Sequence, residues 1–116
     1  MAPPSQLSIA TSAVQRLVHE EASYHKELEQ QKKRIEKAEQ NTDDENAEYQ
    51  LKQERRALEE TKAVFPSLRK RIDEAVAKLE QQLESGKESG DPAPVEEINK
   101  AKAAVVEAKK AMREIA

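Results

Sequence analysis

The sequence has no cysteine and no tryptophan, only two glycines, and three aromatic side chains among 116 residues: Tyr24, Tyr49 and Phe65. Without cysteine, the chain has neither a disulfide framework nor a thiolate zinc site. Both glycines lie between residues 84 and 94, so there is no glycine-rich loop to cradle a phosphate. With so few aromatics, any hydrophobic core must be thin and aliphatic.

Long apolar runs are also missing. No run approaches the ~20 residues that a membrane span needs, and the first ten residues, MAPPSQLSIA, lack the basic and apolar regions of a secretory signal. Charges of both signs are interspersed and sum to −3, whereas a general nucleic-acid binder needs a net basic surface. We therefore expect a soluble cytoplasmic protein that binds neither membranes nor nucleic acid.

What the chain does have is a helical composition and a helical pattern. Ala, Glu, Lys, Gln, Leu and Arg dominate, as in long helices and coiled coils. In the first third of the chain the core-facing positions recur in steps of four and three, which is a heptad pattern. The pattern predicts a helix over about 5–40, with these positions on its inner face: Ala10, Val14, Leu17, Glu21, Tyr24, Leu28, Gln31, Ile35 and Ala38.

A second heptad pattern continues without a change of phase through Pro66. It predicts one helix over about 44–85, kinked at Pro66, with the proline on the solvent face. The alternative is that Pro66 is the first residue of a separate helix, a position that favours proline. The inner positions of this pattern are Ala47, Leu51, Glu54, Leu58, Thr61, Phe65, Leu68, Ile72, Ala75, Leu79 and Gln82.

The segment ESGKESGDPAP, from Glu84 to Pro94, reads as a linker because it holds both glycines and two prolines. The predicted linker proper spans 86–92, and a third heptad pattern predicts a short helix over about 93–115. Together the three helices predict one domain over 1–116, an all-α, rod-like, antiparallel three-helix bundle. We expect the most buried side chains to be Leu17, Tyr24, Leu28, Leu58, Phe65, Leu68 and Ile72.

Polar residues interrupt the inner faces of the first two helices. If the chain folds back near residue 43, Gln31 lies opposite Glu54 and Tyr24 lies near Thr61. Polar residues at such positions weaken a bundle but fix its register. Alternatively, Glu54 leans outward, with its stem packed and its carboxylate in water.

Catalytic and metal-binding patterns are weak. His19 and His25 are six residues apart and do not share a helix face as two ligands would. Carboxylates such as Glu20, Glu21 and Glu27 fit a solvated helix face better than an acid–base pair, which needs a pocket. We expect no enzymatic activity, no cofactor and no metal.

Basic residues cluster in three places, at 32–34, 55–56 and 69–71. One interpretation is simple solvation of helix faces; the other is a surface for an acidic partner protein. In an antiparallel hairpin the first two clusters are level with one another and would merge into one patch. The candidate protein-binding residues are Lys32, Lys33, Arg34, Lys52, Arg55 and Arg56.

Two stretches carry a resemblance to a known family. VQRLVHEEASYHKELEQQKKRIEK, residues 14–37, resembles the first helix of the tubulin-binding cofactor A family, also called tubulin-specific chaperone A. YQLKQERRALEETKAVFP, residues 49–66, resembles the start of that family's second helix, including its proline. The likeness covers roughly the first 85 residues, whereas the linker is longer and richer in glycine and proline than the family pattern. The matching positions of the second stretch are Tyr49, Lys52, Gln53, Leu58, Glu60, Thr61, Lys62, Phe65 and Pro66.

The resemblance implies a function that periodicity does not show. A cofactor of this family captures β-tubulin released from the cytosolic chaperonin and holds it until it pairs with α-tubulin, without nucleotide. It implies a cytoplasmic, cytoskeleton-associated chaperone that works alongside other tubulin-folding cofactors, and an acidic partner, since tubulins are acidic. Composition alone leaves an alternative, a generic coiled-coil adaptor or oligomerisation module.

Overall fold

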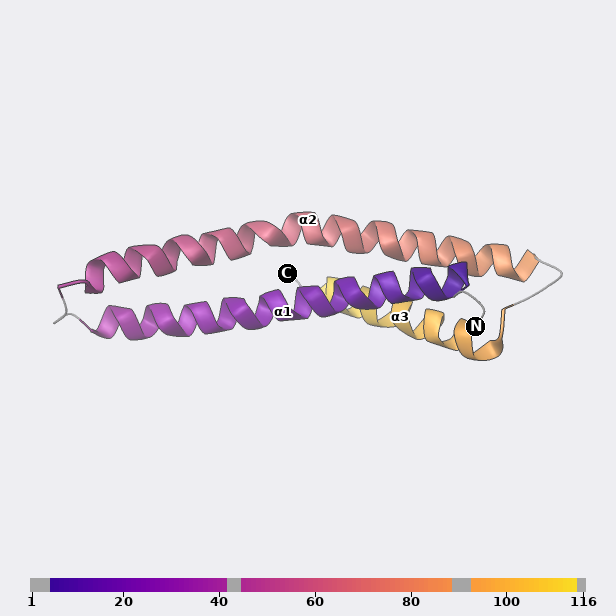
Figure 1. Cartoon of the computed structure of the whole chain (residues 1–116), viewed down its shortest axis with the longest axis horizontal. Helices are drawn as coiled ribbons and strands as arrows, with labels where there is room; N and C mark the ends of the chain where they lie inside the picture. Colours follow the sequence, from indigo (N-terminus) through magenta and orange to yellow (C-terminus); the bar gives the residue numbers. More distant parts are fainter. Residues whose placement is uncertain (1–4, 42–44, 89–92, 115–116) are drawn as a thin grey trace. The chain divides into compact units, whose positions relative to one another are not determined.

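A computed structural model describes residues 5–41, 45–88 and 93–114 of the chain. It contains three helices, α1 (Gln6–Gln40), α2 (Ala47–Glu88) and α3 (Val95–Glu114), and these described ranges contain no strand (Figure 1). The predicted all-α class with three helices is therefore confirmed.

The helices divide into two compact units. One unit combines Met1–Glu20 with Leu68–Ala116 and so contains parts of all three helices; we call it the three-helix unit. The other, Glu21–Ser67, contains the second half of α1 and the first half of α2; we call it the two-helix unit. The prediction of a single domain over 1–116 stays a prediction.

The helix ends differ slightly from those predicted. α2 begins at Ala47, three residues after the predicted start, which at residue 44 lies outside the described residues. It ends at Glu88, three residues past the predicted end, because Gly86 continues the helix instead of ending it. A glycine inside a helix costs only about 1 kcal/mol relative to alanine. Of the predicted linker 86–92, residues 89–92 lie outside the described residues, as does residue 115.

Pro66 does not separate two helices. α2 is continuous across it, so the alternative of a new helix starting at Pro66 is wrong. The proline side chain is exposed, in agreement with its predicted place on the solvent face. Since proline removes one helical hydrogen bond and crowds the preceding turn, this is where α2 is expected to bend.

The start of α1 is capped by a side chain. Ser5 Oγ accepts a hydrogen bond from the backbone N–H of Ser8 at 3.1 Å, which satisfies one of the free donors of the first turn. The same hydroxyl donates to Glu97 Oε1 on α3 at 3.2 Å. The cap therefore also joins the start of α1 to the start of α3.

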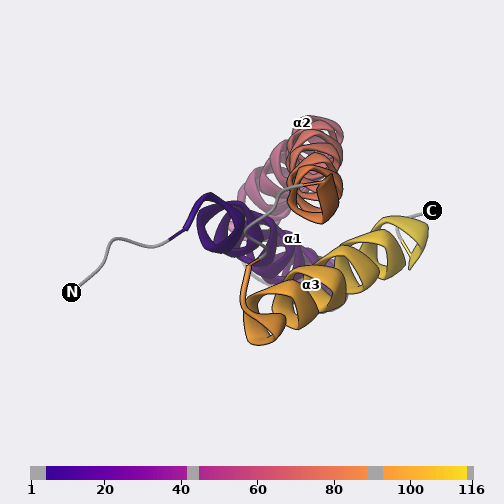
Figure 2. The same cartoon turned by 90° about the vertical axis from the view of Figure 1, so that its right-hand side faces the viewer.

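The three-helix unit holds the aliphatic core. Val14, Leu68, Ile72 and Leu79 are the largest fully buried side chains among the described residues. They come from α1 and α2, and α3 covers them with small side chains, which allow a close approach between helices. Figure 2 views α1 and α2 nearly end-on, with α3 running obliquely beside them. The buried alanines of α3 are Ala101, Ala104 and Ala108.

The two-helix unit is packed differently. Its inward aliphatic and aromatic side chains are only half-buried, because two helices cover only one side of each other. The burial predicted for Leu17, Leu68 and Ile72, all in the three-helix unit, is confirmed. It is wrong for the four expected core residues of the two-helix unit: Tyr24, Leu28, Leu58 and Phe65.

Candidate protein-binding site

The inner face of the two-helix unit contains polar residues. Gln31 is only 3% exposed, and its Oε1 has no hydrogen-bond partner among the described residues. The carboxylate of Glu54 is not turned fully to water: it is half-buried and pairs with Arg34. The predicted facing of Gln31 and Glu54 stays a prediction.

Three side chains with rings, Tyr24, His25 and Phe65, pack together at the other end of this unit. Tyr24 meets Phe65 edge-on, with the ring centroids 6.4 Å apart, so its ring contact is one turn beyond the Thr61 that was predicted. His25 lies against the same phenyl ring at 4.6 Å and pairs with the buried Glu21, Nε2 to Oε1, at 2.8 Å. His25 therefore contacts the Phe65 ring on α2 and the Glu21 carboxylate on α1.

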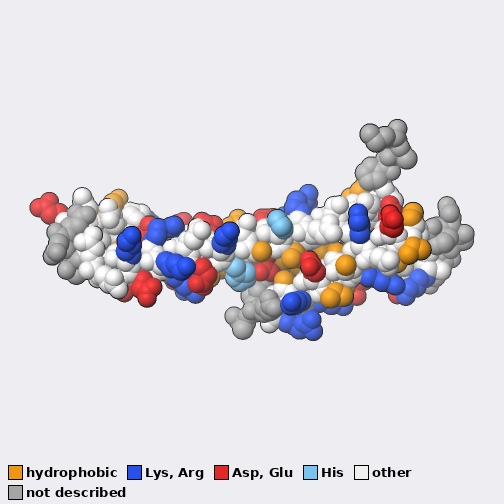
Figure 3. All heavy atoms as spheres, turned by 90° about the horizontal axis from the view of Figure 1, so that it is seen from below, with side chains coloured by type: hydrophobic (Ala, Val, Ile, Leu, Met, Phe, Trp, Pro, Cys, Tyr) orange, Lys and Arg blue, Asp and Glu red, His pale blue; other side chains and the backbone are white. Residues whose placement is uncertain are grey.

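All six predicted binding residues belong to the two-helix unit, and all are exposed. Figure 3 shows the setting: charged and polar side chains dominate the visible face of this unit, whereas hydrophobic side chains gather over the three-helix unit. The six residues are thus accessible to a partner: Lys32, Lys33, Arg34, Lys52, Arg55 and Arg56.

Three of these cations already have carboxylate partners. Two pairs join α1 to α2: Arg34 Nε lies 3.2 Å from Glu54 Oε2, and Arg55 Nη2 lies 3.4 Å from Glu39 Oε1. Lys32 makes a longer pair within α1, 3.8 Å from Glu29. Exposed pairs of this kind contribute only about 0–1 kcal/mol, so they leave these cations able to exchange partners.

The structure does not merge the six residues into one patch. Lys52, Arg55 and Arg56 are spaced by three and four residues and share one side of α2. Lys33 follows the buried Gln31 by two residues, a rotation of about 200°, so it lies on the side of α1 away from α2. Arg34 instead reaches across to Glu54. Sequence spacing along the hairpin predicted which residues are level, but not which sides of the helices they occupy.

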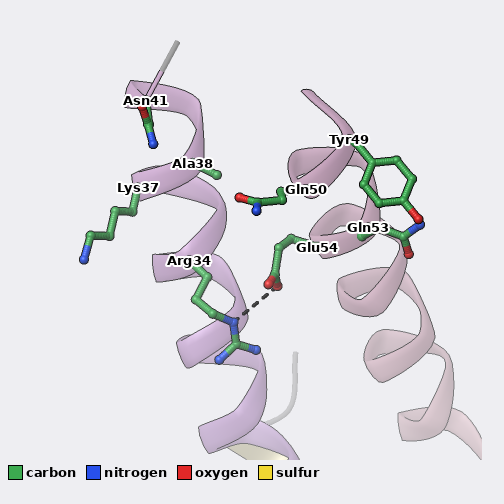
Figure 4. A pocket seen from close by; sticks show the side chains of 8 residues that line it. All are labelled: Arg34, Lys37, Ala38, Asn41, Tyr49, Gln50, Gln53 and Glu54. Carbon is green, nitrogen blue, oxygen red and sulfur yellow. Dashed lines mark hydrogen bonds and ion pairs between the residues drawn. The ribbon is translucent and has the colours of Figure 1, made fainter. Parts of the chain in front are cut away.

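An open hollow lies between α1 and α2 near their loop-proximal ends, with a volume of about 710 Å³. The Arg34–Glu54 pair closes one end of it (Figure 4). Its other polar lining includes Lys37 from α1, Asn41 directly after α1 and Gln53 from α2. The lining is therefore rich in cationic and amide groups, with its one carboxylate already paired.

Tyr49 is a surface residue that is not among the candidate binding residues predicted from the sequence. Its side chain is 65% exposed, and in Figure 4 the ring projects from α2 away from α1 and lies beside Gln53. It lines the larger hollow and also a second one of about 340 Å³, whose other lining residues are Lys52, Gln53 and Arg56. Lys52, Gln53 and Arg56 follow Tyr49 by three, four and seven residues, and none of the four occupies an inner heptad position. This spacing is the sequence signal that identifies the surface.

Neither a cluster of metal ligands nor a membrane-spanning helix is found in the described ranges. They contain no group of three or more His, Cys, Asp or Glu side chains placed to hold a metal ion. No helix built from them is long and apolar enough to cross a membrane.

Comparison with known proteins identifies the family. The family model of tubulin binding cofactor A matches residues 2–105. The chain belongs to the tubulin binding cofactor A family. The resemblance seen in the two helical stretches is thereby confirmed, and it extends into α3.

Several tubulin-specific chaperones A are similar to this chain. The protein of Oryctolagus cuniculus is 39% identical over 83 residues, covering 72% of this chain and 74% of the relative. The Homo sapiens protein is 36% identical with the same coverage. The Saccharomyces cerevisiae protein is 35% identical, covering 71% and 76%. The crystal structure of tubulin folding cofactor A from Arabidopsis thaliana matches with a TM-score of 0.76 at 33% identity, over 90% of this chain and 92% of that one.

Proposed function

We propose that this chain is a tubulin-folding cofactor that captures β-tubulin released from the cytosolic chaperonin and holds it until it pairs with α-tubulin. The observation that carries the proposal is the family match over residues 2–105, together with a solved cofactor A that shares the fold across 90% of the chain. The protein acts in the cytoplasm, alongside other tubulin-folding cofactors.

The proposed mode of action is binding without catalysis or nucleotide. The only two glycines lie between residues 84 and 94, so neither belongs to a phosphate-binding loop. Capture should then proceed equally with ATP, with GTP, or after both have been removed by apyrase. Nucleotide-dependent capture would contradict this part of the proposal.

The proposed contact surface is the outward face of α1 and α2 in the two-helix unit. The six basic residues there are exposed, and the salt bridges of three of them are weak enough to be exchanged. Against an acidic partner, such charges raise the association rate and set orientation. Their effect should weaken as salt screens it.

A triple charge reversal tests the surface. Lys33→Glu with Arg55→Glu and Arg56→Glu should weaken β-tubulin co-purification by about tenfold at low salt and less at physiological salt. Lys33 and Arg56 have no ion pair with any described residue, whereas reversing Arg55 also places like charges beside Glu39. Circular dichroism therefore accompanies the binding measurement.

A matched control makes the same change in net charge elsewhere. Lys100, Lys102 and Lys110 are exposed on α3 in the three-helix unit. Their combined reversal to glutamate should leave capture unchanged. Equal loss in both triple variants would show a response to net charge alone. Self-association of the wild-type protein without any tubulin binding would instead support an adaptor or oligomerisation module.

A further inference from the structure

We infer that the two hollows beside Tyr49 bind an extended acidic segment of the captured partner, with the Tyr49 ring as its anchor. The inference rests on the proposed function for the partner's identity, but it names a binding mode that the basic residues alone do not. Its basis is the arrangement of Tyr49, Lys52, Gln53 and Arg56 on one side of α2.

The charges lining the two hollows favour a carboxylate-bearing ligand. Lys37, Lys52 and Arg56 have no ion pair with any described residue, and all three are exposed. The one carboxylate lining the hollows, Glu54, is already paired with Arg34 at 3.2 Å. A ligand with carboxylates therefore gains partners without displacing an acid of the protein.

The amide groups favour a polypeptide over other polyanions. Asn41 and Gln53 each offer both a donor and an acceptor, which matches the alternating N–H and C=O groups of an extended backbone. A phosphate polymer would instead need a continuous basic stripe on a net basic surface. This chain has a net charge of −3.

The ring provides the anchor. Exposed tyrosine is enriched among the residues that dominate binding energy, since its ring is large and has few rotatable bonds. From Tyr49 to Arg56 the helix rises about 10 Å, the length of about three extended residues. A short acidic segment can thus lie along α2, with one end against the ring and its carboxylates reaching Lys52 and Arg56.

The experiment compares variants that do not alter charge. Binding of a fluorescein-labelled Glu-Gly repeat peptide is measured by anisotropy, and capture of purified β-tubulin is measured in parallel. Tyr49→Ala should weaken both by about tenfold, and Tyr49→Phe should stay within about twofold of wild type. Val106→Ala, at a side chain 63% exposed on α3 in the three-helix unit, is the control and should change neither.

The outcomes separate this inference from the proposed function. Wild-type peptide binding in Tyr49→Ala, or equal binding of a Ser-Gly repeat peptide, would overturn the inference. Displacement of the acidic peptide by a single-stranded oligonucleotide at a lower concentration than by unlabelled peptide would overturn it as well. If the wild-type protein captures no β-tubulin but binds the peptide in a Tyr49-dependent way, the proposed function fails and the acidic-segment site stands.

Discussion

The three-helix unit and the two-helix unit share the two long helices α1 and α2, whose heptad patterns look alike in both units. In the three-helix unit, Val14, Ile72 and Leu79 are completely buried, and α3 supplies the third wall. Among the described residues of the two-helix unit no aliphatic side chain reaches that burial, and the buried side chains are instead polar: Glu21, Gln31 and Thr61.

The difference shows how strongly the burial of inner side chains depends on the third helix. A heptad pattern identifies the side of a helix that faces a partner, but complete burial needs a partner on each side of that stripe. Fully burying a leucine or valine contributes about 1.5–3 kcal/mol, so most of the stability should reside in the three-helix unit. The two-helix unit is left with exposed side chains and shallow hollows that a partner protein can cover.

The largest expected effect comes from a matched pair of leucines on α2. Leu68→Ala in the three-helix unit should destabilise the protein by about 2–5 kcal/mol, because it leaves a cavity in a closed core. Leu58→Ala, at a half-buried position in the two-helix unit, should cost roughly 1–2 kcal/mol. Urea unfolding followed by circular dichroism measures both. Equal losses would mean that the two units are equally well packed.

A smaller change in the free energy of unfolding, of opposite sign, is expected when Gln31 is replaced. Gln31→Leu removes a buried oxygen that has no hydrogen-bond partner among the described residues and replaces it with apolar surface. It should stabilise the protein by about 1–2 kcal/mol. Guanidinium unfolding would show this as a higher midpoint at unchanged slope. A destabilised variant would mean that the amide is fully hydrogen-bonded and that the polar inner face is not a source of weakness.

Pro66→Ala probes the proline inside α2, one residue before the end of the two-helix unit at Ser67. The proline is exposed within a continuous helix, so alanine should restore one backbone hydrogen bond and improve helix propensity. We expect stabilisation of about 1 kcal/mol, below the ~3 kcal/mol cost of proline in an unadapted helix. Thermal unfolding measures it, with Ser67→Ala as the neighbouring control. A loss of stability would mean that the proline-adapted geometry is itself needed for packing.

The smallest expected effects concern one exposed interhelical ion pair from each unit. Arg34→Gln removes the pair with Glu54, and Lys109→Gln removes the 3.2 Å pair with Glu80. Each should cost about 0.5 kcal/mol or less, and less still at high salt. If Arg34→Gln cost clearly more than Lys109→Gln, the two-helix unit would depend on its charges to hold its helices together.

Much of the fold follows from the sequence alone. Heptad spacing located all three helices, and the unchanged phase across Pro66 correctly predicted that α2 continues through the proline. Burial was harder to predict, because Leu58 and Leu68 are both inner positions of the same pattern. They differ in whether α3 lies alongside, which a local pattern does not encode. The end of α2 was missed because Gly86 is a weak helix breaker next to favourable neighbours.

The candidate site was predictable only in part. Sequence clusters correctly indicated exposed cations in the two-helix unit. Rotation around each helix then separated Lys33 and Arg34 from the side shared by Lys52, Arg55 and Arg56. Tyr49 was identified as a family position but not as an exposed side chain, since exposure follows from the rotation of the side chain relative to the inner face.

Hydrogen exchange measured with and without β-tubulin tests most directly whether stability and binding reside in different units. In the free protein, amides over 68–83 should exchange more slowly than amides over 47–60, because the former belong to the closed core. Adding β-tubulin should slow exchange over 47–60 and leave α3 unchanged. Protection confined to α3, with none over 47–60, would contradict binding through the two-helix unit.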